Sequence, residues 1–232
     1  MNQMLFIEDF ISLIFPKICA ACGNSLWKHE EILCLSCDFH LPRTNFHLAL
    51  DNPVSQLFWG RVKFESAASY LYFHKGNNVQ RLIHRLKYKG RKDIGVFLGK
   101  QYGLHLKYSP FFNTVQRILP VPLHKKKLMQ RGYNQSEEFA IGIAESMNIP
   151  VDRHALYRKK ATETQTKKSR FKRWQNVADV FAVRDPGSLE MLHILLVDDV
   201  ITTGATLESC ILALADIKGI RISIATIAVA PA

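Results

Sequence analysis

The chain has 232 residues, of which 47% are hydrophobic and 22% charged; this excludes a disordered protein and allows one full α/β domain with a small extra module. A formal net charge of +11 suits a polyanionic partner, which can be a nucleic acid, an acidic membrane surface or a phosphorylated metabolite. The sequence has no run of about 18 apolar residues and no secretory leader, so we expect a cytoplasmic protein without membrane insertion.

The N-terminal part predicts an amphipathic helix over residues 4–15, ended by Pro16, and then a metal module. Four cysteines follow the pattern C-x2-C, eleven residues, C-x2-C: Cys19, Cys22, Cys34 and Cys37. Because the sequence shows no export signal, disulfides are disfavoured. The spacing therefore predicts four thiolates around one tetrahedral Zn²⁺. Four thiolates leave no open position for water, so the zinc is expected to be structural. Redox-active thiols and a chance pattern are the alternatives.

The remaining sequence divides into a mixed segment and a longer α/β segment. We expect an N-terminal module over 1–45, followed by a connector and hood over 46–110. The connector and hood are expected to contain a strand at 67–73 and helices at 77–89 and 93–107. From 111 to 232, strands alternate with helices: strands at 115–123, 154–159, 177–183, 193–199 and 221–230, helices at 134–147 and 205–217. Such alternation predicts an α/β core with a doubly wound parallel sheet, whose sites gather at the carboxyl ends of the strands.

The stretch "LLVDDVITTGAT", residues 195–206, carries the clearest chemistry. Its apolar run predicts a central strand, with Asp198 and Asp199 emerging at the carboxyl end and a helix opening soon after. Free N–H groups at the helix start can hold an anion, Gly204 allows close backbone approach, and threonine hydroxyls add donors. Adjacent carboxylates can bind vicinal hydroxyls directly or through Mg²⁺. The stretch therefore predicts a ribose 5-phosphate site.

This stretch has three alternative interpretations. A nucleoside-triphosphate P-loop requires a lysine that the stretch lacks. A phosphorelay receiver domain also has paired acids after a strand, but only about thirty residues follow Asp199, too few for the rest of such a domain. Simple capping of the next helix by the acids stays open as the structural alternative.

Several motifs in one order resemble a known family. "LLVDDVITTGAT" resembles the phosphoribosyl pyrophosphate (PRPP) signature of type I phosphoribosyltransferases. Together with "PVPLHKKKLMQRGYNQSEEFA", "TETQTKKSRFKRWQNV" and "CAACG...CLSC", it resembles the ComF/GntX family, which is related to amidophosphoribosyltransferases. The resemblance implies a type I phosphoribosyltransferase fold, with a central parallel sheet, helices on both faces, a zinc module and a hood. It also implies transfer of a 5-phosphoribosyl group from PRPP-Mg to an unidentified acceptor, in association with competence and DNA uptake.

The resemblance also implies roles for particular residues. It assigns the ribose hydroxyls to Asp198 and Asp199, and the 5-phosphate to Thr202, Thr203, Gly204, Ala205 and Thr206. A turn after the strand at 115–123 becomes the pyrophosphate loop: His124, Lys125, Lys126, Lys127 and Arg131. The basic stretch 158–176 becomes a flexible catalytic loop with Thr162, Gln165, Ser169, Arg170, Arg173 and Asn176. Asp198, Asp199, Arg131 and Arg170 are the implied catalytic residues.

Parts of this assignment have plainer alternatives. Lys168 stands where the family usually has leucine, and each basic cluster can simply be a solvated face. Lys87 or Lys89 of the hood is expected to face the ligand. A second hypothesis is a non-catalytic PRPP- or nucleotide-sensing adaptor in single-stranded DNA import, with competence proteins or DNA as partners. Against direct DNA binding, Tyr157, Phe171 and Trp174 are spread through one loop and form no stacking platform.

Overall fold

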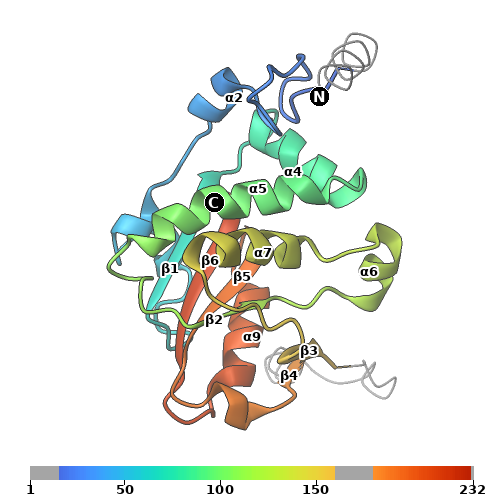
Figure 1. Ribbon diagram of the computed structural model, residues 1–232. Coiled ribbons are helices and arrows are strands. Elements are labelled where there is room, and N and C mark those ends of the chain that lie inside the picture. Colours follow the sequence, from blue (N-terminus) through green and yellow to red (C-terminus); the bar gives the residue numbers. More distant parts are fainter. Residues whose placement is uncertain (1–15, 160–179, 231–232) are drawn as a thin grey trace, which may run out of the picture.

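The computed structural model describes residues 16–159 and 180–230, and its centre is a four-stranded sheet (Figure 1). The strand order is β1-β6-β5-β2, and every neighbouring pair is parallel. The strands are β1 (Ser66–Tyr72), β2 (Arg117–Pro120), β5 (His193–Ile201) and β6 (Arg221–Val229). The parallel sheet predicted from the alternating pattern is therefore confirmed.

Two predicted strands lie outside this sheet. β3 (Leu156–Arg158) and β4 (Phe181–Val183) pair with each other in an antiparallel ribbon. They are shorter than the predicted segments, and their ribbon packs beside α9 (Ala205–Leu214). The alternating pattern indicated strands correctly here, but it did not show that they form a separate ribbon.

Helices cover both faces of the sheet, as the apolar run of β5 requires. Leu195 and Val197 pack into the core beneath α4 (Asn78–Tyr88), α5 (Lys92–Lys107) and α7 (Gln135–Met147). Ile194 and Leu196 face the opposite core, which includes α9. Successive residues of a strand point to opposite faces, so a strand buried on both sides is apolar at every position.

The glycines of α5 are explained by its contact with α7. A Cβ atom placed on Gly99 would come within 3.0 Å of the backbone of α7, and one on Gly142 would meet the backbone of α5 equally closely. Only residues without a side chain allow two helix backbones to approach this far. The helix predicted over 93–107 is therefore present despite its glycines, because tertiary packing stabilises it.

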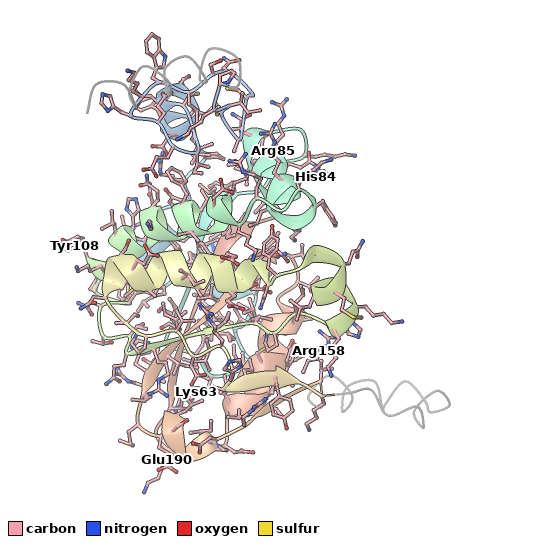
Figure 2. All side chains as sticks on the ribbon, turned by 45° about the vertical axis from the view of Figure 1, so that its right-hand side comes forward. Lys63, His84, Arg85, Tyr108, Arg158 and Glu190 are labelled. Carbon is pink, nitrogen blue, oxygen red and sulfur yellow. The ribbon has the colours of Figure 1, made fainter. Side chains whose placement is uncertain are left out.

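The cysteine module lies beyond α4, at the end of the molecule away from the ribbon of β3 and β4 (Figure 1). It contains α2 (Leu35–Phe39) and is followed by η1 (Phe46–Leu48) and α3 (Pro53–Gln56). Arg81 and Arg85 of α4 donate hydrogen bonds to the carbonyl oxygens of Ala21 and Cys19, at 3.3 and 3.4 Å. Figure 2 shows Arg85 on the side of α4 that borders the module.

The helix predicted over 4–15 lies outside the described residues. β1 and α5, both from the expected hood segment, pack into the layers of the central sheet, while the domain boundaries themselves stay a prediction. Within residues 16–159 and 180–230, none of the helices has the length and apolar character needed to cross a membrane.

Candidate functional site

The two acids lie within β5 and not beyond it, because the strand continues to Ile201. This corrects the expectation that they emerge where the strand ends. One carboxylate oxygen of Asp198 accepts hydrogen bonds from the Ser136 hydroxyl and from the N–H of Asp199, each at 2.8 Å. Asp199 forms an ion pair with Lys87 of α4, with 2.9 Å between Oδ2 and Nζ. Each acid is thus fixed by a different helix.

The environment of Asp198 disfavours its charge. Burial and the neighbouring Asp199 carboxylate raise the pKa of Asp198 to about 7, although the hydrogen bonds it accepts and the Lys87 ammonium oppose this rise. A carboxyl that titrates near neutral pH is typical of functional sites. A cation bound between the two acids, or hydroxyl groups donating to them, would offset their repulsion.

The threonine turn follows β5 and leads into α9. Gly204 has a φ of 76°, a left-handed conformation that favours glycine, and a Cβ there would lie 3.0 Å from the ring of Phe58. The turn and the start of α9 line a hollow of about 280 Å³, which also includes Asp198. The predicted phosphate-binding residues therefore share one hollow: Thr202, Thr203, Gly204, Ala205 and Thr206.

The expected pyrophosphate turn is instead a short helix, α6 (Lys125–Arg131). His124 caps it, accepting a hydrogen bond from the N–H of Lys126 at 3.2 Å. His124, Lys127 and Arg131 line an open cleft of roughly 650 Å³, part of it solvent, together with both acids. Lys125 and Lys126 are exposed and do not line it. Helical periodicity causes this split, since residues one and two apart point in different directions.

The cleft also contains residues that the sequence did not single out. Ser136 lies in the first turn of α7, whose cap Asn134 accepts a hydrogen bond from the Ser136 N–H at 3.2 Å. Arg158 reaches the cleft from β3 and is labelled in Figure 2. Ser136 could have been noticed as the third residue of the capped "NQS" segment; Arg158 carried only the general signal of a basic stretch.

The two hood lysines differ in their position relative to the cleft. Lys87 lines the cleft and pairs with Asp199, whereas Lys89 is the exposed C-terminal cap of α4. The flexible-loop residues lie outside the described residues: Thr162, Gln165, Ser169, Arg170, Arg173 and Asn176.

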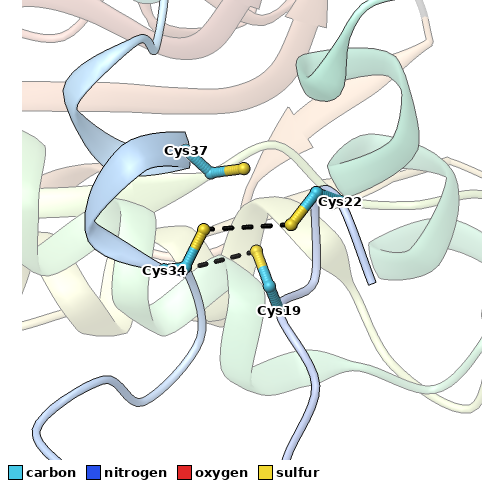
Figure 3. A group of neighbouring side chains, drawn as sticks. All are labelled: Cys19, Cys22, Cys34 and Cys37. Atoms are coloured by element: carbon cyan, nitrogen blue, oxygen red, sulfur yellow. Dashed lines mark hydrogen bonds between the residues drawn. The ribbon is translucent and has the colours of Figure 1, made fainter. Parts of the chain in front are cut away.

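The four cysteines converge as their spacing predicted (Figure 3). Their sulfur atoms all lie within 4.8 Å of one another, and Cys22 Sγ is 3.8 Å from Cys34 Sγ. Zn–S bonds of about 2.3 Å in a tetrahedron place sulfur atoms about 3.8 Å apart, so this donor set fits a zinc ion. N–H groups of Ala21 and Cys34 point at Cys19 Sγ, each at 3.4 Å. Although burial opposes it, backbone hydrogen bonds lower the pKa of Cys19 to about 6.

Comparison with known proteins agrees with this architecture. Residues 129–232 match the family model described as a phosphoribosyl transferase domain. The described sheet, helices and matched domain define a type I phosphoribosyltransferase fold, with four clustered cysteines at its N-terminal side that can hold zinc.

Similarity to three named proteins identifies the family within this fold. The chain is 30% identical over 196 residues to DNA utilization protein YhgH of Escherichia coli K12, covering 82% of this chain and 80% of that protein. It is 36% identical over 131 residues to competence protein F of Haemophilus influenzae, covering 55% and 57%. It is 27% identical over 195 residues to competence protein ComFC of Bacillus subtilis, covering 83% and 75%. The chain belongs to the ComF family.

Proposed function

We propose that the protein binds PRPP with Mg²⁺ and transfers its 5-phosphoribosyl group to an unidentified acceptor, releasing pyrophosphate. The observation that carries this proposal is the position of Asp198 and Thr206, which line both the hollow at the threonine turn and the cleft beside α6. The two spaces therefore meet at Asp198. One end offers backbone N–H groups and hydroxyls, and the other offers cations, which suits a ligand with an anion at each end.

Each part of the ligand has a matching group in this arrangement. The threonine turn and the N-terminus of α9 bind the 5-phosphate, and Asp198 and Asp199 accept hydrogen bonds from the ribose hydroxyls. We assign the pyrophosphate to His124, Lys127 and Arg131, and their place in the lining of the cleft supports this assignment. The two carboxylates also fit Mg²⁺, which prefers oxygen ligands and is held with the substrate phosphates. When bound, Mg²⁺ would neutralise part of the pyrophosphate charge.

Charge development explains how these residues can promote the reaction. Breaking the bond between ribose C1 and pyrophosphate leaves a cation-like sugar and places negative charge on the leaving group. Lys127 and Arg131 stabilise that charge, and a contact of this kind contributes about 3 kcal/mol. The orientation of Arg131 is held by a 2.6 Å hydrogen bond to Gln135 and by stacking over the ring of Tyr88. Arg170 and the rest of the flexible loop complete the proposed catalytic set, and the location is proposed to be cytoplasmic.

The test is titration calorimetry of PRPP with and without Mg²⁺. Wild type is expected to bind only with Mg²⁺, and the double variant Asp198→Asn/Asp199→Asn is expected to lose binding. Asp216→Asn is the matched control, because Asp216 is exposed and lies beyond α9. Binding that persists in the double variant would remove the basis of the site. Where binding is found, acceptors are screened by pyrophosphate release.

A second candidate function is a non-catalytic adaptor that senses PRPP or a nucleotide during single-stranded DNA import. It is favoured by the names of the relatives, which refer to DNA utilization and competence, and by the net charge of +11. Salt separates the two functions, because DNA affinity falls steeply with added salt, whereas PRPP binding requires Mg²⁺. Tight, Mg²⁺-dependent PRPP binding without pyrophosphate release in a broad acceptor screen would favour the adaptor.

A further inference from the structure

The proposed mechanism does not use one segment that contacts the threonine turn. After α3, the chain turns through residues 57–62 and places Phe58, which is fully buried, directly against Gly204. Arg61 follows on the same turn. Both residues contact the threonine turn, and neither lines the hollow there.

The Arg61 guanidinium connects three parts of the structure. It donates to the carbonyl oxygen of Leu57 at 2.9 Å and to that of Thr203 at 3.2 Å. It also forms an ion pair with the carboxylate of Glu208, which lies 147 positions away in the sequence. The same side chain thus holds its own loop, the threonine turn and the first turn of α9.

The position of Glu208 makes this ion pair electrostatically important. Glu208 lies in the first turn of α9, and only 12% of its side chain is exposed. An unpaired carboxylate there would interact with the positive end of the helix dipole, which a bound phosphate also uses, and would repel that phosphate. The ion pair places the Arg61 guanidinium, whose side chain is 38% exposed, where it can offset this charge.

The backbone at the start of α9 is consistent with an anion seat. The N–H of Glu208 bonds to Gly204 O at 2.9 Å, and the N–H of Ala205 makes a long 3.5 Å contact with the Thr203 hydroxyl. Within the described residues, the N–H groups of Thr206 and Leu207 have no such partner. Fixing Thr203 O through Arg61 holds this turn in place before a ligand arrives.

We propose that Arg61 is a positioning residue of the phosphate end of the site: it neutralises Glu208 and holds the threonine turn for a phosphate monoester dianion. This inference rests on the proposed function and adds to it a residue that does not touch the ligand. It predicts an effect on phosphate binding at the threonine turn only, since Arg61 contacts that turn and does not line the cleft beside α6.

The experiment is calorimetry with two probes, ribose 5-phosphate for the threonine turn and Mg²⁺-pyrophosphate for the α6 end. Arg61→Ala is expected to raise the Kd for ribose 5-phosphate by about tenfold or more and to leave pyrophosphate binding unchanged. In the double variant Arg61→Ala/Glu208→Gln, the repelling charge is gone. Its Kd for ribose 5-phosphate is therefore expected to lie within about threefold of that of the Glu208→Gln single variant. Arg117→Ala is the matched control: Arg117 also contacts a carbonyl, that of Ser188, and a carboxylate, that of Asp152, but at the start of β2.

The outcomes separate this inference from the proposed function. Unchanged ribose 5-phosphate binding in Arg61→Ala, beside a wild type that binds, would overturn the inference alone. Loss of ribose 5-phosphate binding that Glu208→Gln does not restore would overturn the electrostatic role. Equal loss of both probes would overturn the inference, because it would indicate general damage to the fold. A folded wild type that binds neither probe would overturn the proposed function and the inference together.

Discussion

Lys87 at the end of α4 lies 2.9 Å from Asp199 in β5, with both side chains largely buried. This ion pair brings a charge from the expected hood to the acids of the central sheet. Arg81 and Arg85 of the same helix contact the cysteine module. The same helix, α4, therefore contacts both the cysteine module and the cleft.

The first prediction concerns the charge that Lys87 supplies. The pKa of Asp198 is about 7, and the charge of Lys87 lowers it. Lys87→Met is therefore expected to raise this pKa. Carboxyl ¹³C NMR titration measures the shift. Lys89→Met is the control, because Lys89 is exposed and does not line the cleft. An equal shift in both variants would show that the ion pair has no specific effect.

The second prediction concerns stability and pH. The folded-state pKa of Asp198, about 7, lies above its ordinary value of 3.8, so between these values the native state binds more protons than the unfolded state. The free energy of unfolding therefore falls as the pH rises from about 4 to about 7, and this contribution stays nearly constant above that range. Asp198→Asn avoids this loss and is expected to be more stable than wild type by about 1–3 kcal/mol above pH 8, with a smaller difference near pH 5.

Urea denaturation at the two pH values measures this difference. Asp216→Asn is the control: Asp216 is exposed, and this variant is expected to differ little from wild type in stability at either pH. A stability gain of the same size at both pH values would mean that Asp198 does not titrate in this range.

The third prediction concerns the cysteine cluster. Metal analysis is expected to find one zinc ion per chain, lost in Cys22→Ser and retained in Cys210→Ala. Cys210 is the control because it is buried in α9, away from the cluster. Removing zinc with a chelator is expected to unfold the module, which is too short to form a core of its own. A zinc-free wild type that is folded over residues 19–37 would contradict the assignment.

The fourth prediction concerns the close contact of α5 with α7. Gly99→Ala places a Cβ against the backbone of α7 and is expected to lower the free energy of unfolding by about 2 kcal/mol or more. Gly187→Ala is the control, since its Cβ would have an ordinary contact of 3.5 Å and Gly187 has no positive φ. Chemical denaturation compares the two; similar small effects would show that the helices can separate without cost.

The sequence by itself predicted the features that depend on local patterns. The apolar run of β5, the helical period of α4 and the cysteine spacing each predicted an element or cluster that the structure contains. Local chemistry also marked the threonine turn, because glycine and hydroxyl residues before a helix have a direct structural meaning. These signals are short in range, so one stretch of chain carries each of them.

Tertiary structure alone decided which side chains meet. It selected Lys127 from three adjacent lysines and Lys87 over Lys89, and it brought Ser136 to Asp198. It also paired Arg61 with Glu208 across 147 positions. Such contacts depend on helix phase and on how separate elements pack against the sheet. A local pattern has no information about those distances, because they are determined by the packing of the whole core.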